Sequence, residues 1–195
     1  AWYDYTEAST ITKDGSNFIS QWRSRIGSNH LNQAVGTNQP LLADDGVLFD
    51  GIDNFLKTDA FTFNQPEFIY IVLKLVNWVE NMFLIDGRGA SSMGIRAYST
   101  SPNLRIFTTS GGFNITAVNG EFYILRVLFN GESSKAIINN NAALTGDIGS
   151  INAEGITLGA RGNATSYANV EFKELIARKV ADNSTDESAD RKSTR

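Results

Sequence analysis

Two carboxylates near the end of the chain, Glu171 and Glu174, flank an apolar stretch and raise the question of acid–base chemistry. Hydrolysis of a glycosidic bond uses two carboxyl groups roughly 5–9.5 Å apart. Residues three positions apart in a regular strand point to opposite faces of the sheet. The spacing therefore predicts solvent-facing strand charges rather than a catalytic pair.

The composition restricts histidine and cysteine chemistry. The chain of 195 residues has one histidine and no cysteine. Disulfides, zinc thiolate sites and thiol nucleophiles are thereby excluded, as is a metal site with two histidines. His30 lies in the turn Gly27-Ser28-Asn29-His30, so we expect a turn residue bonded to backbone. Gly87-Arg88-Gly89 lacks the lysine, the spacing and the following helix of a phosphate-binding loop.

One short stretch is dense in oxygen acceptors of the kind that calcium prefers. It contains Asp44, Asp45, Asp50, Asp53 and Asn54. No fixed-spacing calcium motif appears, and turn formation accounts for Asp50. We expect no cofactor and keep a calcium site on the four aspartates as the alternative.

Aromatic and arginine side chains form the candidate ligand-binding set, because sugar rings pack on aromatic faces while their hydroxyls need hydrogen bonds. The candidates are Trp78, Arg88, Arg96, Tyr98, Arg105 and Tyr167. Strand alternation places Arg96 and Tyr98 on one face and Arg105 on a face of a nearby strand. Such a surface suits a glycan, especially an acidic one, since arginine can bind a carboxylate in a bidentate manner.

Packing is the competing interpretation for each aromatic residue taken singly. Tyr98 and Phe107 can belong to the core, and tryptophans in a sandwich usually pack between the sheets. That applies to Trp2, Trp22 and Trp78. Only the collective pattern favours a binding surface.

The elements that must position these residues are predicted to be strands. Turn signals recur every ~8–12 residues and no segment has a strong helical period, which is typical of an antiparallel sandwich. Phe68–Val76 is predicted as a central strand, and Phe122–Asn130 with Lys135–Asn139 as a long hairpin. Val47–Leu56 is predicted as a second hairpin, turning at Asp50-Gly51.

Charge and hydropathy exclude two partner classes. The net charge is −4 without a basic stripe, so we expect no nucleic-acid partner. No apolar run is long enough to span a bilayer, so we expect no membrane insertion. Residues 1–181 are predicted as one domain. Residues 182–195 form a polar tail in which Ser184 or Thr185 can cap the start of a truncated terminal helix.

Four stretches occur in a familiar order. They are Ala1 to Asp4, Ile19 to Trp22 with Gly27 to Leu31, Gln39-Pro40 with Val47 to Leu56, and Ile156 to Arg161 with Val170 to Ile176. Together the chain resembles laminin-G-like, concanavalin-A-like jelly-roll domains of bacterial and phage surface proteins. Arg25-Ile26 departs from the acidic or polar residue and serine expected there, and the terminal helix is cut short.

The resemblance implies an all-β fold, an antiparallel two-sheet jelly-roll sandwich. Related glucanases carry Glu-x-Asp-x-x-Glu on one strand, whereas this chain has Lys173 at the aspartate position. Related lyases pair a histidine with a tyrosine, and here His30 is far from Tyr123 in sequence. We therefore expect that the protein is not an enzyme.

The expected function is a non-catalytic carbohydrate-binding or adhesion module, a lectin-like domain whose partner is a glycan or cell-surface polysaccharide. The alternative is a structural virion domain, in a decoration, fibre or tail, that contacts other virion or surface proteins. A polysaccharide-degrading enzyme ranks third. The expected location is extracellular, on a cell surface or a virion.

Overall fold

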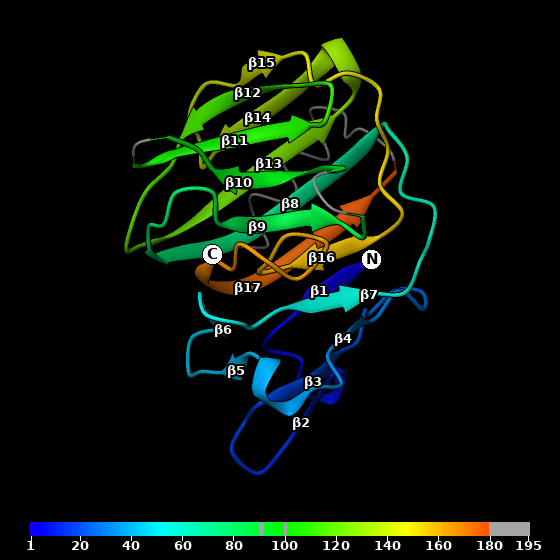
Figure 1. The fold of residues 1–195 in the computed structure, drawn as a ribbon, viewed down its shortest axis with the longest axis vertical. Helices are drawn as coiled ribbons and strands as arrows, with labels where there is room; N and C mark the ends of the chain where they lie inside the picture. The colour runs from blue at the N-terminus through cyan, green and yellow to red at the C-terminus, as the bar shows by residue number, and fades with distance from the viewer. Residues whose placement is uncertain (90–91, 100, 180–195) are drawn as a thin grey trace.

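Two antiparallel β-sheets stacked face to face make up the protein (Figure 1). The computed structural model describes residues 1–89, 92–99 and 101–179. Sheet A has the order β15-β14-β13-β8-β17-β6-β5, and β1 pairs with the remaining part of β17. Sheet B has the order β12-β11-β10-β9-β16-β7-β4-β3-β2.

The strands of sheet A are β1 (Trp2–Asp4), β5 (Leu41–Leu42), β6 (Val47–Asp50), β8 (Glu67–Asn77), β13 (Phe122–Phe129), β14 (Ser134–Ile138), β15 (Leu144–Gly146) and β17 (Asn169–Arg178). Those of sheet B are β2 (Ile11–Lys13), β3 (Ile19–Trp22), β4 (Leu31–Asn32), β7 (Leu56–Thr58), β9 (Phe83–Gly87), β10 (Met93–Ala97), β11 (Asn103–Thr108), β12 (Gly111–Thr116) and β16 (Ile156–Leu158). Short 3₁₀ turns occur at Ala8–Thr10, Gly36–Asn38 and Gly131–Ser133.

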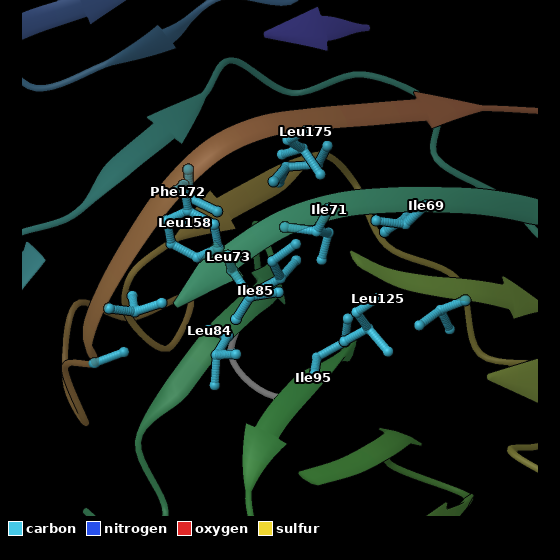
Figure 2. Packing of buried hydrophobic residues seen from close by; sticks show 14 of the residues in the cluster. Ile69, Ile71, Leu73, Leu84, Ile85, Ile95, Leu125, Leu158, Phe172 and Leu175 are labelled. Carbon is cyan, nitrogen blue, oxygen red and sulfur yellow. The ribbon is translucent and has the colours of Figure 1, made fainter. Parts of the chain in front are cut away.

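The core lies between the two sheets. Strands β8, β13 and β17 contribute Ile71, Leu125 and Leu175, and Figure 2 shows these side chains in one buried cluster with Leu84 and Ile95 from β9 and β10. Period-two alternation explains this layer, because every second side chain of a strand enters the space between the sheets.

The strongest sequence signals are confirmed. Phe68–Val76 falls within β8, which pairs with β13 on one side and β17 on the other. The predicted hairpin of Phe122–Asn130 with Lys135–Asn139 is the β13–β14 pair. An all-β sandwich of two antiparallel sheets is therefore correct.

The hairpin predicted over Val47–Leu56 is wrong. Strand β6 pairs with β5 and β17 in sheet A, whereas β7 pairs with β4 and β16 in sheet B. The chain instead crosses between the sheets. The Asp50 carboxylate accepts hydrogen bonds from the backbone N–H groups of Ile52 and Asp53, which widens the turn beyond a two-residue hairpin loop.

The two stretches that resemble the last strands of the family, Ile156 to Arg161 and Val170 to Ile176, also lie in different sheets. Strand β16 belongs to sheet B and β17 to sheet A. The predicted domain boundary at 181 and the tail with Ser184 and Thr185 lie outside the described residues. Within the described part, no helix has the length and apolarity to cross a membrane.

Candidate functional site

The outer face of sheet B carries a transverse row of polar and aromatic side chains. Arg96 of β10 lies directly opposite Arg105 of β11 and opposite Phe83 of β9. Arg105 in turn lies opposite Asn114 of β12. The alternate positions Ile95 and Leu104 are completely buried in the core, so the row faces outward.

A β-bulge in β9 places the Phe83 side chain in this row. Two residues of β9 replace one of β10 between the pairs Ile95–Ile85 and Arg96–Phe83. The extra residue, Leu84, packs in the core beside Ile85, and Phe83 is turned to the outer face.

Three guanidinium groups gather over the aromatic rings of this face. The Cζ atoms of Arg96 and Arg105 lie 5.3 and 4.9 Å from the centre of the Tyr98 ring. Arg96 is also 5.7 Å from Phe83 and 5.3 Å from Phe107. Phe83 and Phe107 meet edge to face, with centroids 5.8 Å apart. The Cζ of Arg161 lies 5.8 Å from the Phe83 ring.

We call this set the arginine–aromatic patch; it consists of Phe83, Arg96, Tyr98, Arg105, Phe107 and Arg161. Cation–π contacts at these distances hold the guanidinium groups against the sheet. The predicted residues Arg96, Tyr98 and Arg105 are thus brought together, while Phe83 and Arg161 were not among the predicted residues.

The local field in the patch is positive. Burial lowers the pKa of Arg96, and the neighbouring cations Arg105 and Arg161 lower it further, while Tyr98 and Asp86 act in the opposite direction. Arg96 donates to the side-chain oxygen of Asn81 at 3.1 Å, and Arg105 donates to that of Asn114 at 3.5 Å. Both arginines therefore have neutral amides as hydrogen-bond partners.

The loop of residues 161–168 is anchored beside the patch and positions Arg161. Asp86, completely buried on β9, accepts hydrogen bonds from the backbone N–H groups of Gly87 and Gly162 at 2.9 Å each. The Lys57 ammonium donates to the carbonyl of Gly162 at 2.6 Å. Burial and the nearby Arg88 lower the pKa of Lys57. A Cβ at Gly162 would lie 2.5 Å from the Gly87 carbonyl oxygen, so the close approach requires glycine.

The remaining predicted ligand residues are not members of the arginine–aromatic patch. Trp78 follows β8 and packs against the core, while Arg88 follows β9 and is exposed. Tyr167 donates its hydroxyl to the Ala164 carbonyl, and its ring lies 6.5 Å from that of Phe55. Of these three residues, Trp78 packs against the core, as the packing interpretation predicted.

The four aspartates proposed for calcium lie at the two ends of β6. Asp44 and Asp45 precede the strand, and Asp45 is 3.8 Å from the Lys173 ammonium. Asp50 ends the strand and caps the following turn, and Asp53 accepts from the Asn54 amide at 3.2 Å. Among residues 1–89, 92–99 and 101–179, no three acidic or histidine side chains converge in a metal-binding group.

Glu171 and Glu174 share one face, contrary to the expectation from their spacing. The pairing of β17 with β8 shifts between Phe172–Leu73 and Glu174–Val72, so Lys173 is an extra residue in a bulge. Phe172 and Leu175 point into the core, which turns both glutamates to the outer face of sheet A. Glu171 is 2.5 Å from the Lys74 ammonium, and Glu174 accepts from the Trp2 indole N–H at 2.7 Å.

The two other tryptophans and the histidine have structural roles. Trp22 is completely buried in the core, and Trp2 lies under the Arg25 guanidinium at 4.0 Å. His30 accepts a hydrogen bond at Nδ1 from the backbone N–H of Ser24, so the predicted turn residue bonded to backbone is confirmed.

Comparison with known proteins identifies the fold. No protein-family model and no curated protein matches the chain. An arabinofuranosidase complexed with arabinofuranosyl-α-1,2-xylobiose matches with a TM-score of 0.70 at 14% identity, over 90% of this chain and 50% of that one. A GH54 α-L-arabinofuranosidase soaked with a cyclic sulfate inhibitor gives 0.69 at 16%, over 90% and 50%. The sialidase of Trypanosoma rangeli in complex with sialic acid gives 0.63 at 11%, over 94% and 31%.

The chain thus spans about half the length of the arabinofuranosidases and a third of the sialidase. At these identities the matches show a β-sandwich and do not single out a laminin-G-like or concanavalin-A-like jelly roll. The expectation that the protein is not an enzyme is corrected, because these three solved structures, two arabinofuranosidases and a sialidase, are glycoside hydrolases. The bulge at Lys173 also removes the geometric reason for that expectation, since both glutamates face the same way. The structural matches place the chain among β-sandwich folds, and none of the comparisons assigns it to a family.

Proposed function

We propose that this chain is a carbohydrate-binding β-sandwich domain, of the laminin-G-like jelly-roll type, that binds its glycan on the arginine–aromatic patch. The observation that carries the proposal is the meeting of two arginines over one tyrosine, with Cζ atoms 5.3 and 4.9 Å from the Tyr98 ring centre. Aromatic rings supply apolar contact for sugar C–H groups, and guanidinium groups donate to hydroxyl and carboxylate oxygens. Such a domain fits an extracellular location, on a cell surface or a virion.

Two features of the patch support this role. Arg96, Tyr98 and Arg105 are partly exposed, so a ligand can reach them. Arg96 and Arg105 belong to the paired strands β10 and β11, and Tyr98 directly follows β10, where its backbone N–H donates to the Asn103 carbonyl at 2.8 Å. Sites on strands are held more firmly than sites on loops. A preorganised surface loses less conformational entropy when it binds.

A glycan array on the purified domain tests the proposal, with Tyr98→Ala as the site variant. We expect saturable binding to a defined glycan class and a roughly 10-fold or greater loss in Tyr98→Ala. Tyr5→Ala is the matched control, because Tyr5 is also a partly exposed tyrosine near a cation, the Lys173 ammonium at 5.9 Å. Trp78→Ala is unsuitable, since Trp78 packs against the core. A blank array with folded protein would refute the proposal and favour a structural role with protein partners.

Glycoside hydrolysis is the second candidate, favoured by the shared face of Glu171 and Glu174. Phe122 lies on the same face, 4.1 Å from the Lys173 ammonium, and adds an aromatic surface. We expect Glu171→Gln and Glu174→Gln each to lower the release of reducing ends from a polysaccharide by roughly 100-fold or more. The exposed Glu132→Gln is the control. If both glutamate variants release reducing ends at the wild-type rate, Glu171 and Glu174 are excluded as a hydrolytic site.

A further inference from the structure

Building on the proposed carbohydrate function, we infer that the arginine–aromatic patch selects glycans that carry a carboxylate, which binds between Arg96 and Arg105. The ligand class is a uronic or similar acidic sugar. Three independent observations on the patch lead to this inference.

The first observation is the direct opposition of two like charges. Arg96 and Arg105 are cross-strand partners in the β10–β11 register. Like charges directly opposite each other destabilise a sheet. Neither guanidinium lies within ion-pair distance of a carboxylate in the described part of the chain, and their side-chain partners are the amides of Asn81 and Asn114. A bound anion would remove the repulsion.

The second observation is an unsatisfied donor. The Nε of Arg96 is buried and has no hydrogen-bond partner. Leaving such a group unpaired costs free energy, and native proteins keep few of them. A carboxylate presents two acceptor oxygens that match the planar fork of a guanidinium, whereas a neutral hydroxyl has no charge to offer.

The third observation concerns Asp86, the carboxylate that acts on the pKa of Arg96. This carboxylate contributes to the field at Arg96, but its two oxygens already accept from the N–H groups of Gly87 and Gly162. It holds the loop that carries Arg161. Arg161 adds a further cation beside Phe83, so Arg96, Arg105 and Arg161 outnumber the one carboxylate, Asp86, that acts on Arg96, and an external anion can complement this excess.

Nuclear magnetic resonance of the arginine side chains tests the inference directly. The Nε–Hε signals of ¹⁵N-labelled protein are followed while glucuronic acid is added at neutral pH, and the neutral methyl ester of the same sugar is the parallel titration. We expect the Arg96 signal to shift in a saturable way with the acid and roughly 10-fold more weakly with the ester. Raising the ionic strength should weaken binding of the acid more than binding of the ester.

Two substitutions of Arg105 separate charge from geometry. Arg105→Gln should lower affinity for the acid roughly 10-fold or more, and Arg105→Lys should restore it only in part, because lysine lacks the planar fork. Arg25→Gln is the matched control, since Arg25 is likewise stacked on an aromatic ring, Trp2, but is paired with Asp4 at 2.9 Å. Arg25→Gln should change the affinity for glucuronic acid by no more than about twofold, as expected when a surface ion pair outside the site is removed.

The outcomes distinguish this inference from the proposed function. Equal affinity for acid and ester, with Arg105→Gln without effect, would overturn the carboxylate site and leave carbohydrate binding intact. Equal binding of a sulfated neutral sugar would overturn the preference for a carboxylate. Absence of any saturable shift with acid, ester and the glycans of the array would overturn both.

Discussion

Glu67, at the start of β8, makes the stability of the protein depend on pH. Its side chain is 1% exposed, and its Oε1 atom has no hydrogen-bond partner. Burial raises the pKa of Glu67 from 4.5 to about 7, while Lys179, the N-terminal ammonium and a hydrogen bond from the backbone of Asn64 act in the opposite direction. Below about pH 7 the native protein therefore favours the protonated carboxyl of Glu67.

The direction of the effect follows from proton binding. Between about pH 4.5 and 7 the native state holds a proton that the unfolded chain has released, so the free energy of unfolding falls as the pH rises. The stabilisation is complete below pH 4.5 and is lost by about pH 7. The difference between a pKa of 4.5 and one of about 7 corresponds to an upper value on the order of 3 kcal/mol, and solvent relaxation reduces it to about 1–3 kcal/mol.

Glu67→Gln removes the titration and keeps the shape of the side chain. We expect the variant to match the wild type near pH 4.5 and to exceed it by about 1–3 kcal/mol above pH 7. Urea unfolding at pH 4.5, 6 and 8 measures the difference at each pH. The exposed Glu80→Gln is the control for the general effect of removing one negative charge. A difference between Glu67→Gln and the wild type that stays constant from pH 4.5 to 8 would refute the reasoning.

Three further substitutions test the packing that supports both faces. Phe172→Ala should cost about 3–5 kcal/mol in urea unfolding, because Phe172 is completely buried edge to face against Phe49; a loss below 1 kcal/mol would contradict this packing. Lys74→Met should cost about 3–5 kcal/mol by leaving Glu171 buried without its cation, and adding Glu171→Gln should recover most of that loss if the pair is the cause. Gly162→Ala should lower affinity for the glycan by displacing the Arg161 loop from the Gly87 carbonyl, with unfolding changed by only about 1–3 kcal/mol; unchanged affinity would separate that loop from the site.

Local pattern was sufficient for the elements whose neighbours lie close in sequence. The β-branched and aromatic run of β8 predicted a central strand, and the spacing of β13 and β14 predicted their hairpin. Alternation along β10 also predicted that Arg96 and Tyr98 face away from Ile95 and Ala97, and the core contains Ile95 and Ala97. These features depend on the period-two geometry of one strand, which the residue order contains.

Features that depend on pairing with distant strands were decided only in the tertiary structure. Asp50-Gly51 has the composition of a hairpin turn, yet β6 and β7 enter different sheets. Strand β6 pairs with β17 in sheet A, and β7 pairs with β16 in sheet B. The bulges at Leu84 and Lys173 arise where the register against a neighbouring strand shifts. Beyond each bulge, the side chains of the strand point to the opposite face from the one that regular alternation would give. Phe83 thereby joins the patch, and Glu171 comes to share a face with Glu174. The sequence by itself determined the strands and the side-chain chemistry, whereas long-range register decided which side chains meet, because a shift of one residue exchanges the two faces of a strand.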